Sequence, residues 1–170
     1  MIYLIWLLRI VHIVSGVIWV GGTLIMTFFI GPAAGATAEA GQKFVAHLMN
    51  NLKFSNRMSV AAGLTILAGV FLYSLDARAG AAWLRSSFAI GLNIGAGSAL
   101  IGFIFGIMIG RVTKAMADLG AQFRGKPTPE QMAQMQAIRK QQATYSNISV
   151  AALILAVIFM AIARYLGVGI

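Results

Sequence analysis

The first long apolar stretch of this chain contains one ionisable residue, His12. From Ile10 to Ile30 there is no Asp, Glu, Lys or Arg. A titratable side chain in hydrocarbon is costly unless it has a partner, so a histidine in such a stretch indicates a functional site. Imidazole can be an axial ligand of haem iron, and together with methionine it also suits Cu(I). We therefore take His12 as the first candidate ligand of this chain.

Several residues are placed to complete a site around His12. Arg9 lies three residues earlier on the same helix face, where its guanidinium could meet a haem propionate. Met160 could supply a second axial ligand, because antiparallel packing of the helices would bring it to a similar depth. The candidate cofactor-binding residues are His12, Arg9, Trp19, Asn93 and Met160. Thr65 and Ser98 are the other polar residues expected at a similar depth, and together these residues form a polar layer. The glycines expected to leave room for a flat ring are Gly16 and Gly22.

Three interpretations of this layer remain open. In the first, His12 hydrogen-bonds Asn93, Thr65 or a backbone carbonyl and only aligns the helices. In the second, His12 binds haem b; His47 is expected at the opposite side of the membrane, so ligation would be His–Met, five-coordinate or intermolecular. In the third, His12 binds copper, although most of the nine methionines are scattered along the chain. A proton relay is disfavoured, because all four acidic residues lie outside the apolar segments.

The composition predicts an integral membrane protein. Of 170 residues, 59% are hydrophobic and 10% are charged, and the mean hydropathy is +0.85, whereas soluble domains carry about 25% charged residues. Cysteine is absent, which excludes disulfides and thiolate ligands. The net charge of +9 fits topology signals and anionic lipid rather than nucleic acid, because no nucleic-acid-binding motif accompanies it.

Length and apolarity predict four spanning helices in a single domain, residues 1–170. Crossing the hydrocarbon core takes about 20 apolar residues, and the expected spans cover about residues 3–30, 58–75, 87–110 and 148–166. We expect the first span to be retained rather than cleaved as a signal peptide. The expected fold class is an all-α polytopic membrane protein, a four-transmembrane-helix bundle with a cytoplasmic helical extension.

The basic residues predict the orientation of this bundle. Nine of the 13 Lys and Arg residues lie in the connections between the first two and the last two spans, against four on the other side. By the positive-inside rule these two connections are cytoplasmic, so both termini face outward. The expected location is a bacterial-type inner membrane.

Both cytoplasmic connections contain helical patterns. Residues 37–56 are amphipathic, which suits a helix on the membrane surface or one leading into the second span. In the second connection, Thr128, Pro129 and Gln131 predict an N-cap, a first-turn proline and a capping box. The third helix is expected to continue to about Phe123, with a turn at 124–127. A helical hairpin, residues 111–147, should therefore project from the membrane.

The third span is built for close helix contact. Small residues spaced along one face let helix backbones approach each other in lipid, and its glycines are Gly91, Gly95, Gly102, Gly106 and Gly110. They predict packing within the bundle, or contact with a membrane-protein partner or a second copy of the chain. No nucleophile elbow, phosphate loop or zinc-protease motif occurs, and the sequence favours a non-enzymatic role without deciding it.

Most of the chain resembles a known family, with the most specific match in the first span and further similarity at Gly31-Pro32, Ala68-Gly69, the connection 44–57 and residues 159–165. The strings Leu8-Arg9-Ile10-Val11-His12 and Trp19-Val20-Gly21-Gly22 resemble the opening helix of the CopD-like copper-resistance membrane domain and of related uncharacterised integral membrane proteins. The His-to-Trp spacing also resembles HemJ-type protoporphyrinogen oxidases. The resemblance implies a four-helix membrane domain with haem or copper involvement, and only His12 matches a ligand position. Asn93 and glycines stand where a HemJ-type third helix would carry a histidine and a lysine.

These observations give one function prediction and two alternatives. The prediction is a small membrane subunit, associated with haem b or electron transfer, with His12 as ligand. The first alternative is a ligand-free assembly or accessory subunit of a larger membrane complex. The second is copper handling.

Overall fold

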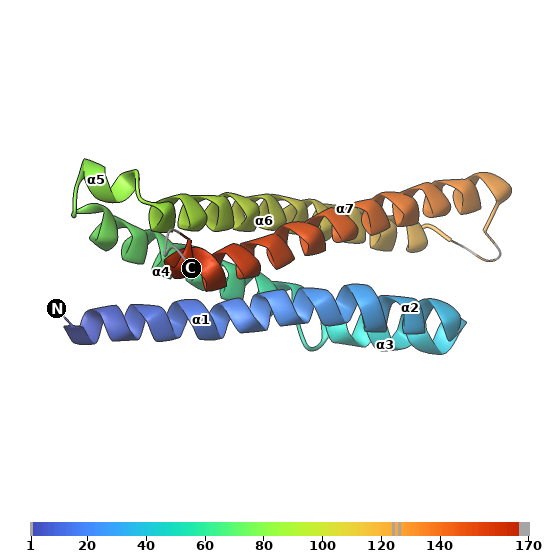
Figure 1. Cartoon of the computed structure of the whole chain (residues 1–170). Helices are drawn as coiled ribbons and strands as arrows, with labels where there is room; N and C mark the ends of the chain where they lie inside the picture. The colour runs from blue at the N-terminus through green and yellow to red at the C-terminus, as the bar shows by residue number, and fades with distance from the viewer. Residues whose placement is uncertain (1, 124, 126, 167–170) are drawn as a thin grey trace.

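The computed structural model describes residues 2–123, 125 and 127–166, and these residues are almost entirely helical (Figure 1). Within them, four helical segments are long and apolar enough to cross a membrane: Ile2–Ala36, Phe54–Ala77, Ser87–Gly120 and Pro129–Tyr165. The prediction of an all-α fold with four such helices is therefore confirmed.

The first segment is one long rod with a local irregularity. Helix α1 (Ile2–Ile25) passes through a π-helical turn, η1 (Met26–Ile30), into α2 (Gly31–Ala36). The N–H of Gly31 donates to the carbonyl of Met26, five residues earlier. The next residue, Pro32, has no N–H and crowds the preceding turn, so a wider turn relieves the conflict. The sequence placed the end of the apolar span near residue 30, whereas the rod continues to Ala36.

Helix α3 (Ala38–Asn50) reverses direction and packs along α2 (Figure 1). The reversal occurs at Ala38, which adopts a left-handed conformation with φ of 47°. Gly41 is buried against the backbone of Ala34, where any larger residue would collide. The sequence predicted this helix, either on the membrane surface or leading into the next span, and did not predict its packing on α2. The structure shows that α2 is its neighbour.

The other long helices complete two antiparallel pairs. Helix α4 (Phe54–Ala77) packs on α1, and α6 (Ser87–Gly120) packs on α7 (Pro129–Ile162), which ends in a 3-10 turn, η2 (Ala163–Tyr165). The short α5 (Ala81–Leu84) connects the two pairs. The start of α1, the end of α4, the start of α6 and the end of α7 gather at one end of the molecule (Figure 1).

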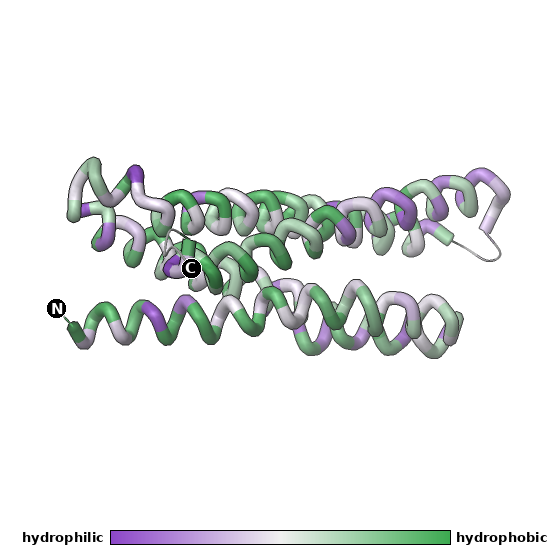
Figure 2. Tube along the Cα trace, in the orientation of Figure 1, coloured by the Kyte–Doolittle hydropathy of each residue, from purple (hydrophilic) through white to green (hydrophobic). Residues whose placement is uncertain are grey.

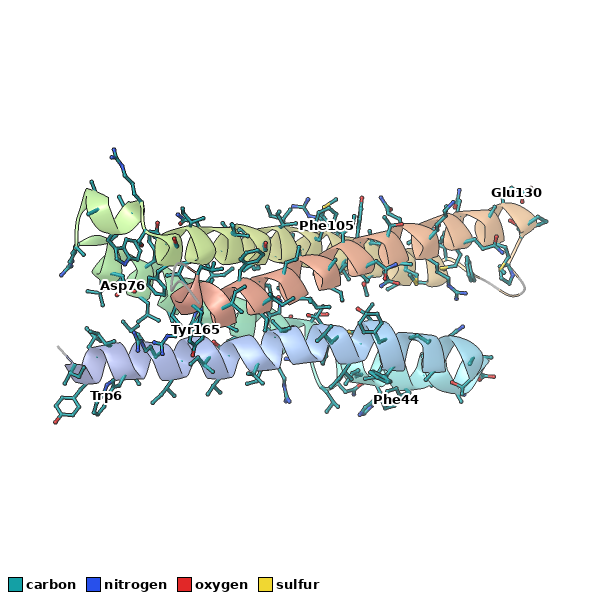
Figure 3. All side chains as sticks on the ribbon, viewed as in Figure 1. Trp6, Phe44, Asp76, Phe105, Glu130 and Tyr165 are labelled. Carbon is teal, nitrogen blue, oxygen red and sulfur yellow. The ribbon has the colours of Figure 1, made fainter. Side chains whose placement is uncertain are left out.

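The α6–α7 hairpin is longer than a bilayer core. Each helix has 34 residues, which corresponds to about 51 Å at 1.5 Å per residue, against about 30 Å of hydrocarbon. Hydrophilic residues gather toward the far end of the hairpin (Figure 2), where Glu130 lies (Figure 3). The predicted helical extension is therefore present. Helix α6 ends at Gly120 rather than near Phe123, and residues 124 and 126 of the expected turn lie outside the described residues.

The predicted capping box at the start of α7 is confirmed. The backbone N–H of Gln131 donates to Thr128 Oγ1 over 3.3 Å, and the N–H of Thr128 donates to Gln131 Oε1 over 3.0 Å. The pKa of Glu130 is lowered, because its carboxylate accepts hydrogen bonds from its own backbone N–H and from the Thr128 side chain. A carboxylate in the first turn also suits the positive end of the helix.

Small residues set the distance between α6 and α7. A Cβ atom at Gly102 would lie 2.7 Å from Cγ and Cδ2 of Leu153, and one at Gly91 would lie 3.1 Å from Cα of Ala163. The hydroxyl of Ser149 donates to the carbonyl of Gly102 over 3.0 Å. Part of the glycine face of α6 therefore packs inside the chain.

One small cluster joins the two helix pairs. It consists of the buried residues Trp19, Ala61, Ala62 and Leu153, with Val20, Ile66 and Phe103 packed around it. The Trp19 side chain is 5% exposed, and its ring meets that of Phe103 edge to face, with centroids 6.2 Å apart. The outer faces of the long helices carry exposed Ile, Leu, Val and Phe side chains.

Candidate functional site

His12 is held between α1 and α4 by a hydrogen bond to the backbone. Its Nδ1 lies 2.8 Å from the carbonyl oxygen of Thr65. A carbonyl oxygen only accepts, so Nδ1 carries the proton and donates it. In the neutral ring the lone pair is then on Nε2. The structure therefore fixes the tautomer of a neutral His12.

A glycine on α4 lets the imidazole ring approach the helix backbone. A Cβ atom at Gly69 would lie 2.9 Å from Cε1 and 3.1 Å from Nδ1 of His12. Gly69 is one helical turn after Thr65, so its N–H is the regular intrahelical donor to the carbonyl that His12 also uses. A carbonyl has two lone pairs and can accept both bonds. The close approach of the ring therefore depends on the absence of a side chain at residue 69.

Two hydroxyl groups, those of Ser15 and Thr65, lie next to this bond and hydrogen-bond each other. Ser15 Oγ is 2.9 Å from Thr65 Oγ1. Thr65 Oγ1 can donate to the carbonyl of Ala61 over 2.8 Å, and Ser15 Oγ can donate to the carbonyl of Val11. Two hydroxyl protons thus serve three short contacts, and neither hydroxyl contacts the imidazole ring nitrogens within the described hydrogen bonds. The arrangement ties α1 to α4 and does not activate Ser15 as a nucleophile.

The other candidate residues do not gather around His12. Asn93 and Arg9 are exposed on α6 and α1. Met160 packs against α6, since a Cβ at Gly95 would meet its Cγ at 3.1 Å and its Cε at 3.3 Å. Trp19 is buried in the cluster between the helix pairs. Of the residues proposed from the sequence, the structure brings together His12 and Thr65, with Ser15 as a third member.

Side chains of α4 occupy the space expected to admit a flat ring. A Cβ at Gly16 would meet Thr65 Cγ2 at 3.5 Å, and one at Gly22 would meet Met58 Cε at 3.3 Å. The described residues also contain no cluster of three or more His, Asp or Glu side chains able to hold a metal ion. His12 can offer Nε2 as one ligand, and among the described residues Asn93 and Met160, the other candidate partners, do not lie beside it.

The fold and the site together define a class of protein. It is a helical bundle with four helices suited to a membrane, in which a histidine on one helix hydrogen-bonds the backbone of another. Comparison of the chain with protein-family models, curated proteins and solved structures found no match.

Proposed function

We propose that the chain is an integral membrane protein whose α1, α4, α6 and α7 cross the bilayer. The support is the combination of helix length with apolar outer faces, because exposed Ile, Leu and Phe side chains in such numbers suit contact with lipid. By the positive-inside rule the α2–α3 end and the tip of the α6–α7 hairpin face the cytoplasm, and both termini face outward. A bacterial-type inner membrane is the proposed location.

Within this membrane, the protein serves as a non-catalytic accessory subunit that binds a larger membrane complex through the α6–α7 hairpin. One observation carries the proposal: the part of the hairpin beyond a bilayer's thickness is internally packed. Val112 and Met135 are buried there, and Gln142 Nε2 donates to Thr113 Oγ1 over 2.9 Å. A hairpin with its own packing can present a fixed surface to a partner.

The outer surface of this hairpin carries more basic than acidic residues, since Asp118 and Glu130 are the exposed acidic residues on its described part, and it suits an acidic partner surface. The exposed basic residues on the described part of the extension are Arg111, Lys114, Arg139 and Lys140. An excess of one sign of charge favours and orients association with a complementary surface. The surface available for this contact also includes Met132, which is 43% exposed.

Native electrophoresis of membranes solubilised in a mild detergent tests the accessory role. We expect the wild-type chain to migrate in an assembly well above its own mass of 18.1 kDa. Arg139→Glu with Lys140→Glu should release it, because the hairpin then repels an acidic partner. The matched control, Arg78→Glu with Arg85→Glu, reverses two charges at the opposite end of the molecule and should leave the assembly intact. A wild-type chain that migrates alone, or equal behaviour of the two variants, contradicts the proposal.

Haem b binding at His12 is the second candidate, and the tautomer of His12 favours it. Histidine ligands commonly donate their other ring N–H to a carbonyl, which orients the ring and raises its basicity. His12 has this arrangement, with Nδ1 bonded to Thr65 and Nε2 available. Because α4 fills the space beside Gly16 and Gly22, a haem would have to lie at the exposed side of α1 and take any second ligand from another chain.

A difference spectrum decides this candidate. The protein is expressed with haem available, purified in mild detergent and measured as a reduced-minus-oxidised spectrum. If His12 binds haem b, a Soret and an α band appear, His12→Ala abolishes both, and the control His47→Ala leaves them unchanged. Absence of the bands in the wild type eliminates the haem function, and bands that survive His12→Ala eliminate the assignment to His12.

A further inference from the structure

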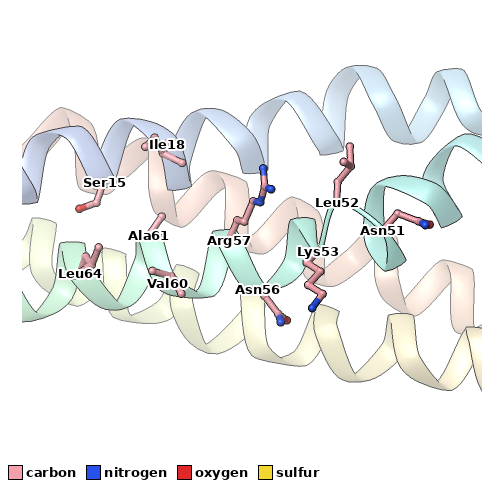
Figure 4. Close-up of a pocket in the computed structure, with 10 residues that line it drawn as sticks. All are labelled: Ser15, Ile18, Asn51, Leu52, Lys53, Asn56, Arg57, Val60, Ala61 and Leu64. Atoms are coloured by element: carbon pink, nitrogen blue, oxygen red, sulfur yellow. The ribbon is translucent and has the colours of Figure 1, made fainter.

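A groove of about 530 Å³ lies where α1 meets the first half of α4 and the turn that precedes it (Figure 4). Ile18 of α1 and Val60 and Leu64 of α4 give the groove an apolar wall. Lys53 and Arg57 line its other end. Figure 4 shows Arg57 reaching toward α1, while Lys53 points in the opposite direction, away from α1. One groove therefore combines an apolar wall with a cationic end.

No acidic residue neutralises this cationic end within the described structure. The only ion pair among the described residues joins Lys43 to Glu39, with Nζ 2.7 Å from the carboxylate oxygen. Lys53 and Arg57 are both exposed, and the sequence contains no Asp or Glu between Glu39 and Asp76. The two cations are therefore available to an anion from outside the chain.

The turn that carries Lys53 is fixed by backbone hydrogen bonds. The N–H groups of Asn51 and Leu52 donate to the carbonyl of His47, over 2.9 Å and 3.2 Å. Lys53 itself has a left-handed backbone with φ of 50°, and its carbonyl accepts from the N–H of Arg57 over 3.1 Å. Both basic residues thus start from a defined backbone at the mouth of the groove.

The position of the groove along α4 matches the boundary of a bilayer. Helix α4 has 24 residues, or about 36 Å at 1.5 Å per residue, slightly more than a hydrocarbon core of about 30 Å. Its first turn then lies at headgroup level. Val60 and Leu64, one and two turns further along, lie at the level of acyl chains. The order of cationic end and apolar wall is the order of phosphate and acyl chain in a phospholipid.

We propose that this groove binds one anionic phospholipid, with its headgroup phosphate on Arg57, within the positive field of Lys53, and an acyl chain along Ile18, Val60 and Leu64. The guanidinium of Arg57 can take two phosphate oxygens at once, and the ammonium of Lys53 adds a second positive charge. The apolar wall selects a lipid over free phosphate. This site rests on the proposed membrane insertion and is independent of the proposed partner contact.

Native mass spectrometry of the full chain in mild detergent tests the site, with dioleoyl phosphatidylglycerol and dioleoyl phosphatidylcholine as probes. We expect a single phosphatidylglycerol to be retained in preference to phosphatidylcholine. Lys53→Asn with Arg57→Gln should weaken phosphatidylglycerol binding about 30-fold, because each basic residue near the phosphate contributes about fivefold. Asparagine is chosen at residue 53 because it tolerates the left-handed backbone. The control Arg78→Gln with Arg85→Gln removes two charges elsewhere and should leave binding unchanged.

Two further arms separate the lipid from its headgroup. Val60→Trp, at a position that is 61% exposed, fills the groove and should remove binding of both lipids. Glycerol phosphate should not displace the bound phosphatidylglycerol. Equal binding by the wild type and the Lys53 and Arg57 variant, or displacement by glycerol phosphate, overturns the site. Resistance of the wild type to alkaline extraction from membranes tests insertion separately, so an inserted protein without lipid preference refutes the groove alone.

Discussion

Trp19→Ala should separate the two helix pairs and lower the free energy of unfolding by about 2–4 kcal/mol. The side chain is 5% exposed and fills the cluster where α1 and α4 meet α7. Lipid tails are as apolar as this cluster, so the loss comes from van der Waals packing and the remaining void rather than from transfer to water. The edge-to-face contact with Phe103 is lost as well, and such pairs contribute about 0.5–1.5 kcal/mol beyond their buried area.

The effect of Trp19→Ala on the contact between the two pairs should be large, because most packing lies within each pair and little lies between them. Helix α1 packs mainly on α4, and α6 packs mainly on α7, whereas the pairs meet over a limited surface that includes Trp19. Each pair can remain a helical hairpin after the pairs part. We therefore expect Trp19→Ala to change the distance between the pairs while the helix content stays close to that of the wild type.

The chain contains no cysteine, so two introduced cysteines can carry a fluorescent donor and acceptor. Exposed Ala46 on α3 and Ala133 on α7 are suitable sites. During titration of SDS into mild detergent, energy transfer should be lost at a lower SDS fraction in Trp19→Ala than in the wild type. Trp6→Ala, which removes a 55% exposed tryptophan from the same helix, should follow the wild type. Coincident curves for the two variants would show that Trp19 does not join the pairs.

The four long helices could be predicted because their signal is local. An apolar run of sufficient length specifies a helix whatever its neighbours are, since lipid leaves no other way to satisfy the backbone. The capping box at Thr128 and Gln131 is equally local, because its donors and acceptors lie within one turn. The direction of α3 is not local. It depends on the left-handed backbone of Ala38 and on the contact of Gly41 with α2. The hydrophobic periodicity of the sequence indicates neither of them.

The hydrogen-bond partner of His12 could be predicted only in part from the depth of each residue along its span. His12 was expected to meet a side-chain partner such as Asn93 or a backbone carbonyl, and the structure selects the carbonyl of Thr65. Every residue has a carbonyl, so sequence alone cannot select one. The signal that was available is Gly69, one turn after Thr65, since a glycine in a span permits close approach of another group. Depth alone also says nothing about rotation, which places Asn93 on the exposed side of α6.

Gly102→Leu should force α6 away from α7 and destabilise the longest helix pair. A Cβ atom at residue 102 would already lie 2.7 Å from Cγ and Cδ2 of Leu153, and Leu153 is 1% exposed, so it has little room to move. Overpacking of this kind costs about 1–3 kcal/mol. Separation of the helices also breaks the bond from Ser149 to the carbonyl of Gly102, and such bonds within a membrane contribute about 0.6 kcal/mol on average.

Gly106→Leu isolates this clash from the general effect of replacing glycine in a helix. Apart from the neighbouring residues and backbone of its own helix, no atom lies within 4 Å of a Cβ at Gly106, and both substitutions gain about 0.5–1 kcal/mol in helix propensity. The control should therefore unfold at an equal or higher SDS fraction than the wild type, and Gly102→Leu at a lower one. Adding Leu153→Gly to Gly102→Leu exchanges the large and the small residue across the contact, so it should recover part of the loss. A double-mutant cycle with no recovery would show that the two residues do not set the distance between α6 and α7.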